Sequence, residues 1–382
     1  MKQTVFIFGR TPDLSLLELT SLYPQATLVA PTVALVNEPV NTAATMRLLG
    51  GTVKIAEVAA RVPELTQEVF LSILLREAEG RQITFGISTY GGLNLSNSLS
   101  VAIKRQLTER GVRARFIETK HDDILSSVVV AKQHVVELVA MKKDGEIMIG
   151  VTRAVQDFED WNKRDSGRPA ADPKAGMLPP KVARMIVNVA LTGCDPSRHP
   201  MLLDPFCGVG TILMEASLRG ASTIGSDLSE DAVEKAKANL AWMLRTYPET
   251  AALFSNVMVS DATNLARHVP KGSIDAIATE PFMGQAIREQ DMARLSAARV
   301  KNILKGLEKL YIGSLKEWVG LLKPRARVVI AMPAYVTPSG VFRVKNVVDR
   351  CERDGYTLLT GPIGYSRPQA VVRREFYIFQ KK

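Results

Sequence analysis

The segment LLDPFCGVGTILMEA (202–216) carries the residues best suited to binding a small-molecule cofactor. A predicted strand ends at Asp204, and the Gly-Val-Gly-Thr turn that follows lets the backbone pass close to a ligand before a helix begins. Asp227 and Asp261 close the next two predicted strands. Carboxylates at these places can accept hydrogen bonds from ribose hydroxyls and from an adenine amine. The three acids, in this order, indicate a nucleoside cofactor lying across the carboxyl edge of a parallel sheet.

A hydride-transfer enzyme that uses a dinucleotide is the competing interpretation of this segment, because such enzymes share the fold and the glycine turn. Their phosphate loop normally has a third glycine, which lets a pyrophosphate approach the helix N-terminus. Leu213 stands at that position here. The sequence therefore favours a cofactor without phosphates, and S-adenosylmethionine fits.

The fourth predicted strand, IDAIATEPFMGQ, ends in an acid followed by a proline, Glu280-Pro281. This pair places a carboxylate and a backbone carbonyl in a rigid turn at the cofactor edge. Methyl transfer to an exocyclic amine needs such acceptors, because the lone pair of that nitrogen is delocalised into the ring. Phe282 or Met283 can pack against the flat face of a base. We therefore predict Glu280, Pro281 and Phe282 as the catalytic residues.

The elements that must position these residues divide the chain into segments. From Lys181 onward, predicted strands alternate with helices, which is typical of a parallel, doubly wound sheet. Residues 157–180 are charged and proline-rich without a sustained apolar period, so they are predicted to be a linker. Residues 1–50 and 51–156 each combine strands and helices. The predicted fold class is α/β, with a Rossmann-type domain at 181–382 and two smaller α/β modules before it.

The chain is basic, with 49 Lys and Arg against 39 Asp and Glu, and residues 301–382 hold 16 basic and 6 acidic side chains. Such an excess is compatible with a polyanionic partner. The tract 104–120 has six basic and two acidic residues, and a solvated charged helix with an edge strand is its alternative interpretation. The predicted RNA-phosphate contacts are Lys104, Arg105, Arg113 and Arg115, then Arg164 and Arg168, with Arg367, Arg373 and Arg374 as further candidates.

Cysteine and histidine positions argue against metal chemistry. The three cysteines, Cys194, Cys207 and Cys351, form no CxxC pair, and the four histidines are scattered without metal-ligand spacing. No metal site is predicted, and a reducing compartment is favoured. No leader pattern and no run of about 18 apolar residues occurs. We therefore expect a cytoplasmic protein with no membrane association.

Together, LLDPFCGVGTILMEA, EPFMG and RDSGRPAADPKAGMLPPKVARMIVNVA resemble the THUMP-containing tRNA guanosine N2-methyltransferases that modify position 10. The resemblance extends over nearly the whole chain. It implies an N-terminal ferredoxin-like region at 1–50, a THUMP RNA-binding domain at 51–156 and an S-adenosylmethionine-dependent methyltransferase domain at 181–382. It also implies tRNA as the partner and, as some members of the family require, a small activating subunit.

The resemblance further implies the roles of single residues. The cofactor would contact Asp204, Cys207, Gly208, Gly210 and Thr211, with Asp227 at the ribose, Asp261 near the adenine, and Pro179 in the segment that closes over it. The family usually has Asp-Pro-Pro-Tyr or Asn-Pro-Pro-Tyr at the catalytic turn, where this chain has Glu-Pro-Phe-Met. Two alternatives stay open: methylation of another RNA amine (guanosine N2 in rRNA or adenosine N6), and a non-catalytic RNA-binding relative.

Overall fold

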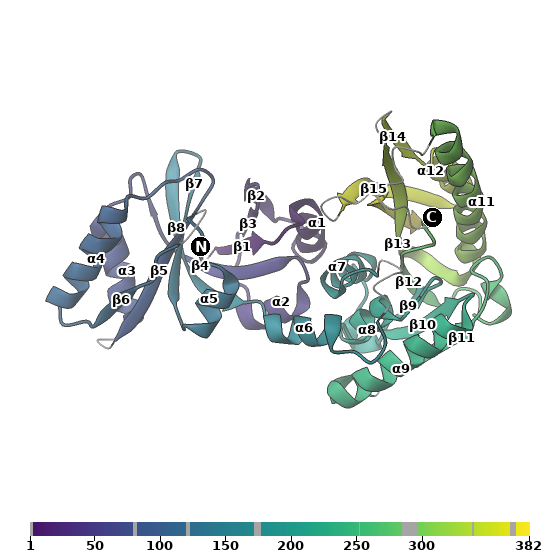
Figure 1. Cartoon of the computed structure of the whole chain (residues 1–382), viewed down its shortest axis with the longest axis horizontal. Coiled ribbons are helices and arrows are strands. Elements are labelled where there is room, and N and C mark those ends of the chain that lie inside the picture. Colours follow the sequence, from purple (N-terminus) through teal and green to yellow (C-terminus); the bar gives the residue numbers. More distant parts are fainter. Residues whose placement is uncertain are drawn as a thin grey trace. The chain divides into compact units, whose positions relative to one another are not determined.

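The computed structural model describes residues 3–78, 82–119, 123–171, 177–251, 253–284, 296–337, 340–366 and 372–382. The chain divides into two compact units, Met1–Phe158 and Glu159–Lys382. Figure 1 labels the helices and strands of both. Each unit is built around its own eight-stranded sheet.

The first unit is organised by a sheet with the strand order β2-β3-β1-β4-β8-β7-β5-β6. Its strands are β1 (Thr4–Phe8), β2 (Thr27–Ala30), β3 (Val33–Val36), β4 (Thr52–Val62), β5 (Ile83–Tyr90), β6 (Ala114–Phe116), β7 (Val136–Lys143) and β8 (Glu146–Val155). The modules expected at 1–50 and 51–156 share this sheet, because β1 pairs with both β3 and β4. All five residues of β1 are buried, as a central strand requires.

Helices cover this sheet, and their bounds are α1 (Pro12–Leu22), α2 (Thr42–Leu48), α3 (Gln67–Ala78), α4 (Asn97–Glu109) and α5 (Ser127–Lys132). The apolar faces of α3 and α4 join one core with β5 and β7, including Phe70, Leu74, Ile103 and Leu107. The apolar residues of both segments recur at helical spacing, which places them on one face of each helix.

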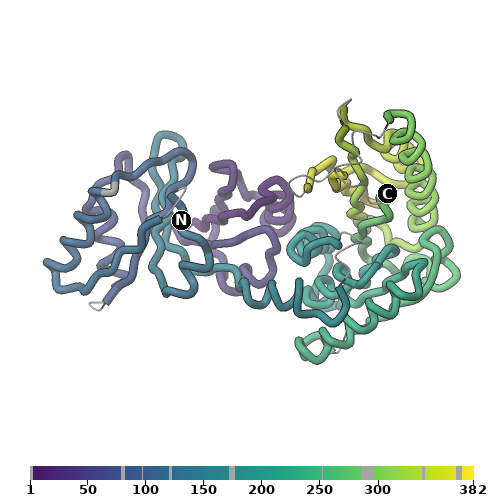
Figure 2. The backbone as a smooth tube through the Cα atoms, in the orientation of Figure 1, coloured from purple at the N-terminus to yellow at the C-terminus, as the bar shows by residue number. Residues whose placement is uncertain are grey.

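The second unit has the strand order β11-β10-β9-β12-β13-β16-β15, with β14 paired to β13. The strands are β9 (Met201–Asp204), β10 (Ser222–Asp227), β11 (Ser255–Val259), β12 (Ile274–Thr279), β13 (Leu322–Thr337), β14 (Gly340–Arg343), β15 (Tyr356–Tyr365) and β16 (Val372–Lys381). Strands β9 to β13 are parallel, and β16 runs antiparallel between β13 and β15. Figure 2 shows β16, in yellow, beside β13. The predicted doubly wound sheet is confirmed.

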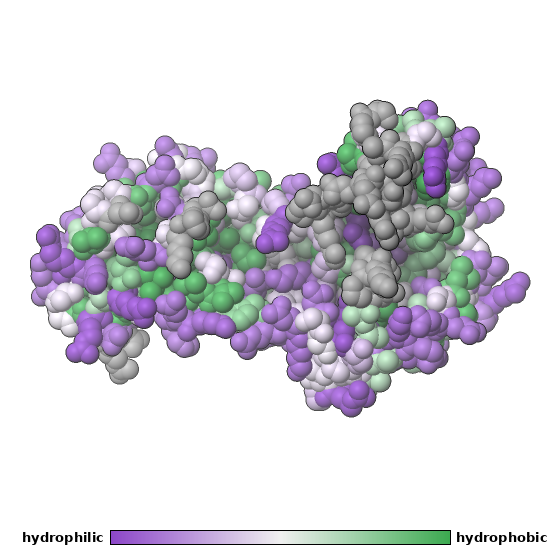
Figure 3. Space-filling model, viewed as in Figure 1, coloured by the Kyte–Doolittle hydropathy of each residue, from purple (hydrophilic) through white to green (hydrophobic). Residues whose placement is uncertain are grey.

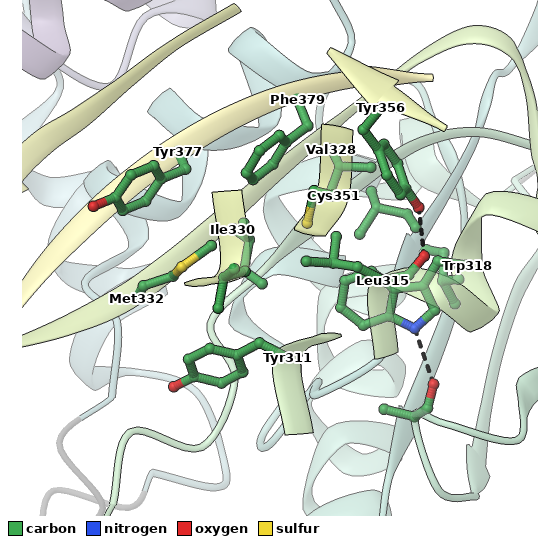
Figure 4. Packing of buried hydrophobic residues seen from close by; sticks show 14 of the residues in the cluster. Tyr311, Leu315, Trp318, Val328, Ile330, Met332, Cys351, Tyr356, Tyr377 and Phe379 are labelled. Atoms are coloured by element: carbon green, nitrogen blue, oxygen red, sulfur yellow. Dashed lines mark hydrogen bonds between the residues drawn. The ribbon is translucent and has the colours of Figure 1, made fainter. Parts of the chain in front are cut away.

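Helices pack on both faces of this second sheet (Figure 1). One face carries α7 (Pro180–Ala190), α8 (Thr211–Ser217) and α9 (Glu230–Thr246), and the other carries α11 (Ala297–Leu321) and α12 (Asn346–Arg353). Figure 4 shows the core beneath α11, where the Trp318 indole donates to the Ala262 carbonyl and the Tyr356 hydroxyl to the Leu315 carbonyl. The polar atoms of these buried aromatic side chains are thus satisfied.

The segment expected to be a linker begins with a helix, α6 (Phe158–Ser166). From Glu159 onward it belongs to the second unit, and Trp161 is buried. The sequence showed no apolar period there because α6 buries Arg164 along with its tryptophan. Residues 172–176 lie outside the described part of the chain.

The surface is largely polar. In Figure 3, hydrophilic residues cover most of the visible face, with smaller hydrophobic areas between them. Among the described residues, we find no helix with the length and apolar character needed to cross a membrane.

Candidate active site

Four acidic residues stand at the carboxyl ends of neighbouring parallel strands. Asp204 and Asp227 are the last residues of β9 and β10, Asp261 follows β11 by two residues, and Glu280 directly follows β12. Parallel strands end at one edge of a sheet, so the order β11-β10-β9-β12 brings these acids together. The predicted cofactor acids and the predicted catalytic acid therefore share one edge. From β9 the chain continues to β10 and β11 on one side, and it then crosses to β12 and β13 on the other side.

The glycine turn after β9 is fixed by the acid of the next strand. Asp227 accepts hydrogen bonds from the Gly208 amide (3.0 Å) and the Ser229 amide (3.0 Å). Gly208 and Gly210 have φ values of 49° and 82°, which favour glycine. A Cβ on Gly210 would lie 3.3 Å from the Ala236 Cβ of α9, whereas one on Gly208 would meet nothing within 4 Å. Gly210 therefore packs against a helix, and the Gly208 backbone faces open space.

Asp204 is a buried acid between the glycine turn and the end of β12. It is 1% exposed and accepts hydrogen bonds from the Thr279 hydroxyl (2.7 Å) and the Phe206 amide (3.2 Å). Burial raises the pKa of Asp204 to about 7, and the nearby carboxylates of Asp227 and Glu280 add to the increase. The two hydrogen bonds lower the pKa but do not offset the effect of burial. This carboxyl thus changes charge near neutral pH.

The other predicted cofactor residues occupy the same edge or its approach. Asp261 uses one carboxylate oxygen to hold the Thr263 amide and hydroxyl, both at 2.8 Å. Pro179 caps the start of α7. Cys207 is buried beside the glycine turn, and burial raises the pKa of its thiol. A neutral thiol is a poor nucleophile, which agrees with a contact role.

The turn after β12 is held from two sides by tyrosines. The Tyr311 hydroxyl of α11 donates to the Phe282 carbonyl (2.8 Å), and the Tyr335 hydroxyl of β13 donates to the Met283 carbonyl (2.6 Å). Pro281 is buried, whereas the Phe282 side chain is 57% exposed. The turn is therefore rigid at its backbone and presents an aromatic face. Residues 285–295, which continue it, are outside the described residues.

Glu280 contacts an arginine from a distant part of the chain. The Arg374 Nε of β16 donates to the Glu280 carboxylate at 2.5 Å, and the two side chains are 13% and 18% exposed. This guanidinium therefore holds the predicted catalytic carboxylate, and the candidate role of Arg374 as an RNA-phosphate contact stays a prediction. Its neighbour Arg373 is exposed, and Arg367 falls outside the described ranges.

Burial argues against the prediction that Arg164 and Arg168 contact RNA, because these residues are only 6% and 4% exposed. Arg164 pairs with Glu215 of α8 (2.6 Å), which also pairs with Arg184 (2.8 Å). Burial opposes the charge of Arg164, but its acidic partners leave the pKa raised, whereas burial lowers the pKa of Arg168. Arg168 donates to the Thr211 hydroxyl at the start of α8 (2.6 Å). Arg164 and Arg168 thus hold α8, the helix that follows the glycine turn.

Asn239 makes a second connection between this segment and the glycine turn. Its amide nitrogen donates to the Val209 and Ala170 carbonyls, both at 2.8 Å, and its oxygen accepts from the Ala170 amide at 2.9 Å. Asn239 is not among the residues predicted from the sequence, although a polar residue among the buried apolar positions of α9 is a usable signal. The sequence also does not predict the roles of Tyr311, Tyr335 and Arg374, which have no local signal because their partners are distant in sequence.

The remaining RNA-contact candidates lie in the first unit. Lys104 and Arg105 on α4, and Arg113 and Arg115 at β6, are all exposed. Arg105 makes a loose pair with Glu109 at 3.6 Å. Strand β6 is an edge strand, so these side chains are accessible, and their RNA role stays a prediction.

A parallel sheet with a glycine turn after its first strand and acids after the adjacent strands is typical of Rossmann-type enzymes that bind nucleoside cofactors. Residues 168–356 match the family model of the RMKL-like methyltransferase domain, UPF0020. This region is therefore similar to the methyltransferase domains of that family.

Curated relatives match a shorter part of the chain. A tRNA (guanine(10)-N2)-dimethyltransferase of Pyrococcus abyssi is 38% identical over 126 residues, which is 33% of each chain. One of the same name from Methanothermobacter thermautotrophicus is 37% identical over 132 residues, 34% of each chain. The match thus spans about a third of the length of these relatives. The crystal structure of TrmN from Thermus thermophilus covers 100% of both chains with a TM-score of 0.53 and 19% identity, which shows a shared fold.

Proposed function

We propose that this protein is a tRNA methyltransferase that uses S-adenosylmethionine to methylate the exocyclic N2 of guanosine at position 10. The observation that carries the proposal is the turn at Glu280, where a carboxylate, a buried proline and a largely exposed phenylalanine follow β12 beside the glycine turn. The names of the matched curated relatives supply the substrate and the position.

The cofactor site proposed here consists of Asp204, Cys207, Gly208, Gly210, Thr211, Asp227, Asp261 and Pro179. These residues fit a nucleoside without phosphates, because the carboxylates of Asp227 and Asp261 can accept hydrogen bonds from hydroxyl and amine groups. The open space at Gly208 gives a ligand access to the backbone. When bound, S-adenosylmethionine supplies a methyl group carried on a positively charged sulfur.

The proposed mechanism depends on hydrogen-bond acceptors and positioning. The Glu280 carboxylate and the Pro281 carbonyl would accept hydrogen bonds from the guanosine amine, which localises the nitrogen lone pair. The carboxylate would also take up the proton that the amine loses on methylation. Phe282 stacks on the base, and Arg374 keeps the Glu280 carboxylate in place. Holding both reactants in this way can lower a barrier by roughly 7–11 kcal/mol.

For the rest of the chain, we propose that the first unit contains the THUMP domain and binds tRNA through Lys104, Arg105, Arg113 and Arg115. These exposed cations suit phosphate contacts. A small activating subunit remains part of the proposal through the family resemblance, as does a cytoplasmic location.

The experiment that tests the function measures transfer of labelled methyl from S-adenosylmethionine to unmodified tRNA transcripts. Product nucleosides are identified by mass, which separates N2-methylguanosine from its dimethyl form, and the position is mapped. We expect product on the intact transcript and none when the position-10 guanosine is replaced. Labelling of rRNA or of adenosine instead would contradict the proposed substrate.

Replacing Glu280 tests the catalytic assignment. In Glu280→Ala, methyl transfer should fall by about two orders of magnitude or more, because the amine loses its charged acceptor, while the affinity for S-adenosylmethionine is retained. Glu280→Gln is the shape-matched comparison and should also be impaired. Unchanged turnover in both variants would remove Glu280 from the mechanism.

A further inference from the structure

A cavity of about 590 Å³ opens at the edge of the second sheet opposite the acids. Its lining includes Cys194, which follows α7, and Asp275, the second residue of β12. Three cations near the start of β13 also line it: Lys323, Arg325 and Arg327. These residues are at the amino ends of the parallel strands, whereas the candidate active site is at their carboxyl ends. The cavity is therefore separate from the methyl-transfer site.

The charges around this cavity do not balance. Its lining contains four cations (Arg198, Lys323, Arg325, Arg327) and two acids (Asp195, Asp275). Lys323 pairs with Asp275 at 2.7 Å, and Arg198 lies 3.7 Å from Asp195. Within the described residues, no carboxylate lies within ion-pair distance of Arg325 or Arg327. Two guanidinium groups thus remain uncompensated at the cavity.

Arg327 is the more enclosed of the two. It is partly buried, and among the described residues its Nη1 donates to the Val189 carbonyl at the end of α7, at 3.5 Å. Burial lowers the pKa of this guanidinium, so the cation is held at a cost that a bound anion would offset. Cys194 does not supply the missing charge, since burial raises the pKa of its thiol.

Arg325 adds a backbone observation. Its φ of 64° places a residue with a large side chain in the left-handed region. Its carbonyl is fixed there by the Gln380 side chain at 3.0 Å. Strained backbone of this kind is found preferentially at ligand-binding positions, and here it sets an exposed arginine at the cavity rim.

We infer that this cavity binds a phosphate group, with Arg325 and Arg327 as the two guanidinium ligands. Guanidinium groups match the geometry of phosphate oxygens, and the volume is within the range of small-molecule sites. The phosphate belongs either to a free nucleotide or to the backbone of an RNA, and the chemistry of the site is the same for both.

The test compares Arg325→Gly/Arg327→Gln with a control of equal charge change, Lys301→Gln/Lys305→Gln on the exposed face of α11. Binding of guanosine 5′-monophosphate and of an unmodified tRNA transcript to the full chain is measured. We expect the arginine variant to lose about tenfold or more in affinity for at least one probe, and the control about twofold or less. Loss for the nucleotide identifies a free phosphate ester, and loss for the transcript alone identifies a backbone phosphate.

The site would be refuted if the arginine variant bound both probes as the control does, or if the unchanged protein bound neither. Folding does not obscure the outcome. Glycine adopts the φ of position 325 without strain, so the melting temperature should not fall. The readout is binding rather than turnover, and a failed methyl-transfer assay would therefore leave this inference standing.

Discussion

At the level of single side chains, the contact between Arg374 and Glu280 fixes the orientation of the proposed amine acceptor. In Arg374→Ala, kcat should fall by about 10- to 100-fold with little change in KM for S-adenosylmethionine, because a misplaced carboxylate costs positioning rather than cofactor binding. Arg374→Lys should recover part of the rate. An exposed cation of α11 gives the control, Lys316→Ala, which should keep its kcat. Equal losses in the two alanine variants would refute the positioning role.

Asp204 predicts a pH dependence of stability. Its pKa is about 7 in the folded protein against an ordinary value of 3.8, so the folded state binds more protons than the unfolded chain between these values. Stability contributed by this group therefore falls as pH rises from about 4 to about 7. Chemical denaturation across this range should show that the stability of the unchanged protein relative to Asp204→Asn falls as pH rises. Parallel curves would contradict the assignment.

At the level of elements, the buried charges of α6, α7 and α8 hold the glycine turn. Arg164 stacks on Trp161, 3.8 Å from the ring centroid, and pairs with Glu215. Arg164→Met should lower the free energy of unfolding by about 3–5 kcal/mol, because it leaves Glu215 buried with less compensation. The exposed pair of Lys237 and Glu234 provides the control, Lys237→Met, with an expected loss under about 1 kcal/mol. Denaturant titration measures the free energy of unfolding of both variants, and equal losses would contradict the role of Arg164.

Local sequence was sufficient for the elements and for the acids at their ends. Apolar periodicity places α3, α9 and the parallel strands, and Asp204, Asp227 and Glu280 stand where a strand must stop. Contacts between distant segments have no such signal. Arg374 is 94 residues from Glu280, and Arg164 looks like a surface cation until α8 supplies Glu215. Charge alone therefore could not show that Arg164 and Arg168 are buried or that Arg374 pairs with Glu280.

At the level of the whole molecule, the first unit folds as one sheet across the boundary expected near residue 50. The Gly50-Gly51 pair suggests a module boundary when the sequence is considered alone. In the structure, however, β1 forms hydrogen bonds with β3 on one side and with β4 on the other. Predictions of module boundaries from composition cannot include such pairing. The THUMP assignment of residues 51–156 stays a prediction.

RNA binding by the first unit should depend on salt. If Arg113 and Arg115 contact phosphates, Arg113→Gln/Arg115→Gln should weaken tRNA binding and reduce the slope of log affinity against log salt by about 1 to 2. Arg61→Gln removes a cation of the same unit that pairs with Glu146 at 3.3 Å, and it should leave the slope unchanged. An unaltered slope in the double variant would support the solvated-surface alternative.

The position of Arg374 in β16 also has a consequence for biosynthesis. A ribosome makes β9 to β12, the glycine turn and Glu280 well before it adds residues 372–381. Strand β16 then inserts between β13 and β15, both already synthesised. A nascent chain thus passes through a stage in which the cofactor loop exists while the guanidinium that orients the acceptor has not yet been translated. On the proposed mechanism, the Glu280 carboxylate would therefore be held in its final orientation only after β16 has joined the sheet.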